Sequence, residues 1–298
     1  MRKKRLAASL LALSLCFSLA ACSGGSSAPA DTTAPESTAP AETTPADTTP
    51  AETAAAESDL AYVQDKGTLV VGITNFAPMD YKAEGSDEWI GFDADMAKAF
   101  AESLGVAVEF QEITWDYKVM ELDSKNIDVV WNGMTLNDEV MAAMSTSVPY
   151  CTNYQTLVYP ADKAADFEGL TSLEGLNIAV ESGSAGEDAA EALGATTVPV
   201  QSQANTLMEV AAGTSDAAVI DVLMAADMTG EGTSYADLVY SVNLNEAQGL
   251  ESEEYGVGFR KGSDLVDVFN EFWAAAVADG TVEATAATYG LQDAIILE

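Results

Sequence analysis

Residues Ile127 to Val140 read I-D-V-V-W-N-G-M-T-L-N-D-E-V and combine a strand, a turn and the start of a helix. The apolar run 127–130 predicts a buried strand. Gly133 allows another group to approach the backbone closely, and Asp138 and Glu139 begin a helical pattern. Short polar side chains and free backbone groups therefore meet at one place, which suits a small polar ligand better than a packed core.

Strand and helix patterns alternate on both sides of this stretch. Before it, we expect strands at 68–73 and 106–113, and helices at 59–67, 94–104 and 116–124. After it, we expect strands at 177–180, 198–201, 217–220 and 255–260, and helices at 186–193, 203–212, 263–278 and from 281. An exposed stretch is expected between 221 and 255. Two such sets in series predict an α/β fold with two lobes, largely parallel sheets and a cleft between the lobes.

The N-terminal residues are predicted to lie outside this fold. A basic start, an apolar run and L-A-A-C at 19–22 predict a signal peptide over residues 1–21. The end of this segment resembles a bacterial lipobox, so we expect lipidation of Cys22; ordinary cleavage with an incidental cysteine is the alternative. Residues 22–58 are rich in Ala, Thr and Pro, which predicts a disordered tether, or alternatively a glycosylated stalk.

Composition argues against several functions. The chain has 48 acidic and 12 basic residues and a formal net charge of −36, which argues against binding nucleic acid or anionic lipid. It contains no histidine, which excludes histidine-based triads, zinc ligands and general bases. Cys151 is the one cysteine beyond the predicted leader and lipid site, so no intrachain disulfide is expected. We expect no enzymatic activity, metal or cofactor.

The order of motifs resembles the extracytoplasmic solute-binding proteins of amino-acid ABC transporters, bacterial solute-binding family 3. The likeness extends from about Leu60 to the end of the chain. It rests on G-T-L-V-V-G (67–72), F-A-P-M-D-Y (76–81), G-F-D-A-D-M-A-K-A-F (91–100), D-V-V-W-N-G-M-T-L-N-D-E (128–139), E-S-G-S-A (181–185), Y-G-V-G-F-R-K-G (255–262) and A-D-G-T (278–281).

The resemblance implies a type II periplasmic-binding-protein-like fold. Each lobe would be a mixed, mostly parallel sheet flanked by helices, and two crossover hinge strands would join the lobes. The crossings would lie near Tyr159-Pro160 and Tyr255-Gly256. Lobe 1 would then comprise 59–158 plus 256–298, and lobe 2 would comprise 160–254.

The resemblance also implies a set of ligand-binding residues. Phe76 matches an aromatic that stacks on the ligand, and Trp115 matches a second pocket aromatic; packing in the core is the alternative for both. Gly133 and Thr135, preceded by Asn132, match positions that bind the ligand's ammonium group. The alternative for Thr135 is helix capping, a role open to Asn137 as well.

Two further matches lie in the second lobe. Asp221 matches the carboxylate that pairs with the ligand's ammonium group, with an N-cap role as the alternative. The turn at Ser182, Gly183 and Ser184 offers backbone N–H groups at a helix start, which suit a carboxylate, although a simple capped loop would explain it too.

The departures from the family pattern concern the ligand's charge. Val140 stands where most amino-acid binders carry an arginine that clamps the ligand's carboxylate, and Glu181 stands where some relatives carry a lysine. Arg260 lies in a motif that looks structural. The expected cleft, with Glu181, Asp221, aromatic faces and no obvious cation, suits a positively charged ligand. Alternatively an amino acid binds, its carboxylate held by the amides of 182–185 and helped by Lys118.

These observations predict a lipid-anchored component of an ABC importer on the extracytoplasmic face of a bacterial cell membrane. It would capture an amino acid or a related cationic amine and deliver it to a membrane permease, with a monomer as the expected state. The alternative is a ligand-sensing module of the same fold that reports to a signalling receptor. An enzyme is disfavoured because histidine is absent and Cys151 has no evident base.

Overall fold

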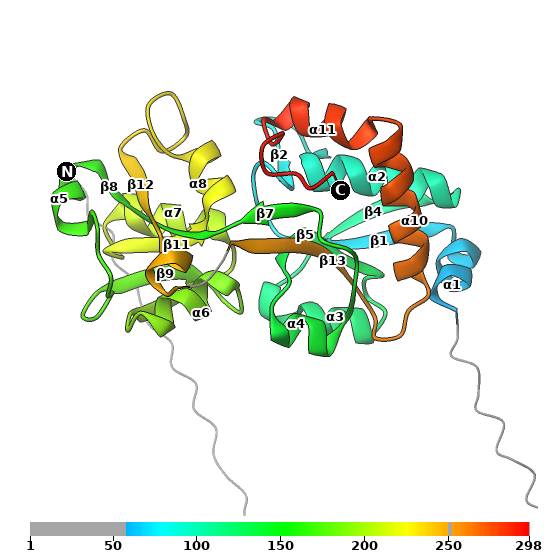
Figure 1. Cartoon of the computed structure of the whole chain (residues 1–298), viewed down its shortest axis with the longest axis horizontal. Coiled ribbons are helices and arrows are strands. Elements are labelled where there is room, and N and C mark those ends of the chain that lie inside the picture. Colours follow the sequence, from blue (N-terminus) through cyan, green and yellow to red (C-terminus); the bar gives the residue numbers. More distant parts are fainter. Residues whose placement is uncertain (1–57, 250–251, 298) are drawn as a thin grey trace, which may run out of the picture. The chain divides into compact units, whose positions relative to one another are not determined.

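A computed structural model describes residues 58–249 and 252–297 (Figure 1). The predicted signal peptide, Cys22 and the tether up to residue 57 lie outside these ranges. Ser58 Oγ accepts a hydrogen bond from the Ala61 amide at 3.0 Å and so caps helix α1 (Asp59–Lys66). No helix in the described ranges combines the length and the apolarity needed to cross a bilayer.

The first lobe is built on a mixed sheet with strand order β4-β1-β5-β13-β6, and β7 also pairs with β13. Strand β1 is parallel to β4 and β5, whereas β13 is antiparallel to β5. The strands are β1 (Thr68–Ile73), β4 (Ala107–Glu112), β5 (Val129–Thr135), β6 (Ser145–Thr146), β7 (Cys151–Asn153) and β13 (Glu253–Phe259). A small hairpin pairs β2 (Tyr81–Lys82) with β3 (Trp89–Ile90).

Helices cover both faces of this sheet. Figure 1 shows α2, α10 and α11 on one side of it and α3 and α4 on the other. Their bounds are α2 (Phe92–Leu104), the 3₁₀ helix η1 (Trp115–Tyr117), α3 (Lys118–Asp123), α4 (Asp138–Ala143), α10 (Leu265–Ala278) and α11 (Thr281–Tyr289). Apolar and aromatic side chains from β5, α2 and α10 meet in the core, where Phe269 lies 5.0 Å from Trp131 and 5.3 Å from Phe100 between ring centroids. Trp131 is therefore a core residue.

The second lobe repeats this plan with strand order β10-β9-β11-β8-β12. Strand β9 is parallel to β10 and β11, and β8 is antiparallel to both β11 and β12. The strands are β8 (Gln155–Pro160), β9 (Asn177–Glu181), β10 (Thr196–Val200), β11 (Ala217–Asp221) and β12 (Leu238–Asn243). The helices are η2 (Ala161–Lys163), α5 (Ala164–Phe167), α6 (Ala185–Ala192), α7 (Gln203–Ala212), α8 (Val222–Met228) and α9 (Leu244–Ala247). The fold is thus the predicted two-lobed α/β architecture.

Strand β5 is longer than predicted. It does not stop at residue 130, where the apolar run ends, but continues to Thr135. Antiparallel pairing with β13 extends it, because Tyr255 lies opposite Thr135, and the register is irregular between Gly256 and Gly258. The predicted turn therefore lies after Thr135, where Asn137 caps α4 by accepting the Val140 amide at 2.9 Å.

The stretch between 221 and 255 is not simply exposed, as predicted. It contains α8, β12 and α9, and Leu238 at the start of β12 is 3% exposed. Strand β12 pairs with β8 at the edge of the second sheet. Its polar and apolar residues do not form a long apolar run, and the pairing partner is distant in sequence, so a local pattern did not reveal it.

The first crossing between the lobes also differs from the prediction. Strand β8 pairs only with strands of the second sheet, so the chain leaves the first sheet between Asn153 and Gln155 and not near Tyr159-Pro160. Leu157 and Tyr159 are buried among apolar side chains of the second lobe, which places β8 there. Strand β13 already pairs with β7 at Glu253, so the second crossing precedes Tyr255 by at least two residues.

Candidate ligand-binding site

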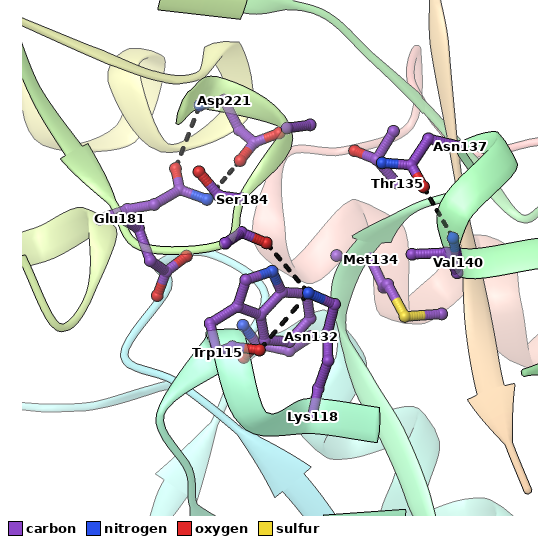
Figure 2. Close-up of a pocket in the computed structure, with 14 residues that line it drawn as sticks. Trp115, Lys118, Asn132, Met134, Thr135, Asn137, Val140, Glu181, Ser184 and Asp221 are labelled. Carbon is purple, nitrogen blue, oxygen red and sulfur yellow. Dashed lines mark hydrogen bonds between the residues drawn. The ribbon is translucent and has the colours of Figure 1, made fainter. Parts of the chain in front are cut away.

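A cavity lies where the carboxyl ends of β5, β9 and β11 meet (Figure 2). Its volume is about 30 Å³, which is enough space for water-sized molecules. Both lobes contribute to the wall, which is lined by Trp115, Lys118, Asn132, Gly133, Met134, Thr135, Asn137, Val140, Glu181, Gly183, Ser184, Ala185, Gln203 and Asp221. Eight of the ten predicted ligand-binding residues are therefore brought together.

Asp221 is the centre of a buried hydrogen-bond network. It occupies the N-cap position of α8, but its side chain makes no capping bond, so the alternative role is not realised. Its carboxylate accepts from Tyr255 Oη at 2.8 Å, from Gln155 Nε2 at 3.0 Å, and from Asn153 and Gln203. Burial raises the pKa of Asp221 to about 7, and the nearby Glu253 adds to this rise.

Glu181 lies at the end of β9 and is 2% exposed. Burial raises its pKa to about 8. The Thr74 side chain opposes this rise, whereas the charge of Asp221 adds to it. Figure 2 shows Glu181 and Asp221 on one side of the cavity and Thr135, Asn137 and Val140 on the other.

Lys118 gives the cavity a cation, so the expectation of a cleft without an obvious one is wrong. Its Nζ lies 4.9 Å from the ring centroid of Trp115 and donates to the Gly183 carbonyl at 3.0 Å. This bond joins α3 of the first lobe to the turn before α6 of the second. Burial lowers the pKa of Lys118, and the charge of Glu181 opposes that shift.

Phe76 does not line the cavity, contrary to the expectation that it stacks on the ligand. It is fully buried, and its ring makes an edge contact with Tyr255 at a centroid distance of 6.3 Å. Gly133 explains this placement, because a Cβ there would lie 2.4 Å from Phe76 Cε1. The missing side chain of Gly133 leaves the space that Phe76 fills.

Two residues that line the cavity, Asn132 and Gly133, already form hydrogen bonds within the protein. The Gly133 amide donates to Asp93 Oδ2 at 2.7 Å. The Asn132 side chain accepts from the Thr74 amide at 3.0 Å and donates to Thr74 Oγ1 at 2.9 Å. These bonds join β5 to Asp93 in α2 and to Thr74, the residue that follows β1.

The turn before α6 does not offer the free amides predicted for a carboxylate. The Ser182 amide donates to the Val200 carbonyl at 3.0 Å, and Ser182 does not line the cavity. The Gly183 amide donates to Glu187 Oε2 at 2.7 Å. The Ser184 amide donates to the Glu181 carbonyl at 3.2 Å. Glu187, one turn into the helix, thus occupies the place of a ligand anion.

Gln203 is the main cavity residue that the sequence did not reveal. It begins α7, and its side chain donates to Asp221 while its Oε1 accepts from the Asp221 amide at 3.1 Å. The polar run Q-S-Q at 201–203 follows β10 directly, at the same carboxyl edge as the other cavity residues, and this position is the signal that could have identified Gln203. Met134 and Ala185 also line the cavity and carry no chemical signal.

No group of three or more acidic or thiol side chains within residues 58–249 and 252–297 is arranged to hold a metal ion. Cys151 is buried and free, and burial raises the pKa of its thiol. The site can therefore bind a polar solute through carboxylates, amides, an ammonium group and one aromatic face.

Comparison with known proteins agrees with this geometry. The sequence profile of bacterial extracellular solute-binding proteins, family 3, matches residues 69–292. The chain belongs to this family. Membership identifies it as a solute-binding protein and places its action outside the cytoplasm. The family's two-lobed fold is the one described above.

Individual family members share the fold over most of their length. The chain is 29% identical to the arginine-binding extracellular protein ArtP of Bacillus subtilis over 230 residues, which is 73% of this chain and 84% of ArtP. A mutant of ArgBP from T. maritima superposes with a TM-score of 0.70 at 28% identity, covering 78% of this chain and 98% of that one. The ancestral amino acid-binding protein AncCDT-1, a precursor of cyclohexadienyl dehydratase, gives 0.68 at 30% identity, covering 78% and 99%.

Proposed function

We propose that this family 3 protein is the lipid-anchored solute receptor of an ABC importer. It captures an amino acid or a related cationic amine between its lobes, performs no chemistry on it, and delivers it to a membrane permease. Ligand binding favours the closed arrangement of the lobes, which the permease would recognise.

The buried Asp221 at the cavity wall is the observation that carries this proposal. A carboxylate that is 5% exposed and surrounded by hydrogen-bond donors is prepared to hold a cationic group. The similarity to ArtP and ArgBP supports a nitrogen-rich ligand of similar size. Trp115 and Lys118 would close the opposite end of the ligand.

A thermal-shift screen of the mature domain tests ligand capture. Amino acids, diamines and quaternary amines are added one by one, and a ligand at about 100 times its dissociation constant stabilises the fold by about 2.7 kcal/mol. Absence of stabilisation by every amine and amino acid would contradict the proposal.

Asp221→Asn tests the site. The substitution keeps the shape of the side chain and removes its charge, so we expect the affinity for the best ligand to fall by about 10- to 100-fold. Calorimetric titration measures the change, and Asp216→Asn, in the turn before β11, serves as a control. Unchanged affinity in Asp221→Asn would remove Asp221 from the site.

A further inference from the structure

We propose that the cavity selects a ligand with two cationic nitrogens and no carboxylate, such as a linear diamine, with one nitrogen at Asp221 and the other at Glu181. This inference rests on the proposed solute capture and names its ligand class. Four observations on the described residues support it: an unpartnered carboxylate oxygen, the proximity of two acids, the local charge balance and the engaged amides.

Glu181 Oε1 is the clearest sign of a second cation site. It is buried, and no donor within the described residues reaches it. A buried carboxylate oxygen without a hydrogen bond is costly, because the protein supplies no replacement for water. Glu181 lines the cavity, so an ammonium group of a ligand can supply the missing donor.

Glu181 and Asp221 lie close to each other. They end neighbouring parallel strands, since β9 pairs with β11 through Ile178 opposite Ala217 and Ala179 opposite Ala218. Neighbouring strands are about 4.8 Å apart, and both side chains line the same cavity, so one small ligand can reach both carboxylates. The charge of Asp221 raises the pKa of Glu181, as expected for two acids that are close together.

The charge balance also favours two ligand cations. Lys118 is the one basic residue among those that line the cavity, and its ammonium group donates to the Gly183 carbonyl. Glu253 adds a third carboxylate next to Asp221, because Gln155 Nε2 donates to both at 2.9 and 3.0 Å. Lys118 therefore shares the cavity wall with two carboxylates, and a third, that of Glu253, shares a hydrogen-bond donor with Asp221. An adjoining cavity adds Asp116, Glu139 and Asp188 to its wall.

Three of the backbone amides beside the cavity that could hold a ligand carboxylate already make hydrogen bonds within the protein. The Gly183 amide is bound by Glu187, the Ser184 amide by the Glu181 carbonyl, and the Gly133 amide by Asp93. On the opposite wall, the apolar Val140 side chain faces the cavity and offers no donor. A ligand carboxylate would meet the negative charges of Glu181 and Asp221 there, and Lys118 is the one cationic side chain in the cavity wall.

Three ligands of matched length test the inference by calorimetric titration of the mature domain. These are 1,5-diaminopentane, n-pentylamine, which lacks the second nitrogen, and L-lysine, which adds a carboxylate. We expect the diamine to bind about 10- to 100-fold more tightly than the other two, the effect of one charge-assisted hydrogen bond. Measurements at about pH 8.5 keep the cavity acids largely ionised.

Glu181→Gln then assigns the second nitrogen. It should weaken diamine binding by about 10- to 100-fold and leave pentylamine binding unchanged, while Glu174→Gln, a substitution at an exposed position of the same lobe, changes neither. An equal loss for diamine and pentylamine would overturn the inference. Far-ultraviolet circular dichroism and the melting temperature verify that both variants fold.

The result also separates this inference from the proposed function. Tighter binding of L-lysine than of the diamine would overturn the dication inference and leave solute capture intact. Failure of all three ligands, and of every compound in the thermal-shift screen, would overturn both.

Discussion

At the scale of single residues, Gly133 shapes the cavity because it has no side chain. Its φ of 54° lies in the left-handed region, and Phe76 occupies the space where a side chain would project. Its amide is held by Asp93, which also accepts from Tyr150 Oη at 2.8 Å. The position of Gly133 in the cavity wall therefore depends on its packing contact with Phe76 and on its hydrogen bond to the buried Asp93.

Gly133→Ala should destabilise the fold through two effects. Left-handed backbone costs an alanine about 1 kcal/mol, and the contact with Phe76 adds about 1–3 kcal/mol. Gly105→Ala isolates the first effect, because Gly105 has a φ of 73° and nothing lies within 4 Å of the added Cβ. Urea unfolding measures both variants. An equal loss of unfolding free energy in the two variants would contradict a destabilising contact between the added methyl group and Phe76.

At the scale of elements, Arg260 forms hydrogen bonds to α1, to α3 and to the residues before β5. It forms two hydrogen bonds of 3.0 Å from Nε to Asp59 at the start of α1. Its Nη1 donates to the carbonyls of Leu122, in α3, and Ile127, just before β5. The structural role expected for this residue is therefore confirmed by its contacts.

Arg260→Met should lower the free energy of unfolding by about 3–5 kcal/mol, because it leaves the buried Asp59 without its partner. The neighbouring Lys261 is a matched control, since its Nζ donates to the carbonyls of Met141 and Met144 near the surface. Lys261→Met should cost less than about 1 kcal/mol. Guanidinium unfolding gives both values, and comparable losses would contradict the proposed role of Arg260.

The elements that were predicted well carry local signals. Helix α1 ends at Gly67, β1 is a β-branched run, and α7 has an apolar stripe, so their bounds followed from neighbouring residues. The extension of β5 and the existence of β12 were missed because distant strands, β13 and β8, stabilise them. Non-local pairing is not encoded in a short window of sequence.

For the same reason, the residues of the candidate site could be predicted only in part from the sequence. Asp221 and Glu181 could be placed at the cleft because both match cleft positions of the family, and both end apolar strands. Phe76 was misplaced, because its position depends on the space beside Gly133 in another strand. The occupation of the Gly183 amide by Glu187 depends on one rotamer, which sequence alone does not determine.

At the scale of the whole molecule, buried acids make stability dependent on pH. Burial raises the pKa of Asp93 and Asp221 to about 7 and that of Glu181 to about 8. A carboxyl group whose pKa is raised by folding contributes stability that is complete below its ordinary pKa and is lost as the pH rises through the raised value. The ligand-free domain should therefore become less stable between about pH 4 and about pH 8.

This dependence is measurable as the melting temperature of the ligand-free domain from about pH 5 to about pH 8. We expect a steady fall in the wild type and a shallower one in Asp221→Asn, which removes one of the three groups. A bound cation reverses the trend, because it favours the ionised forms and its affinity rises by up to about tenfold per pH unit for each proton released on binding. A melting temperature that rises with pH would contradict the assignment.

The bond between the Gly183 amide and Glu187 has a consequence for how such receptors diverge. The carboxylate of Glu187 accepts the Gly183 amide in the turn before α6. Glu187 does not itself line the cavity. Replacing Glu187 by a small neutral residue would free an amide at the helix start for a visiting anion, with Asp221 and Glu181 untouched. We expect that one substitution outside the cavity wall moves such a receptor from cations toward zwitterions.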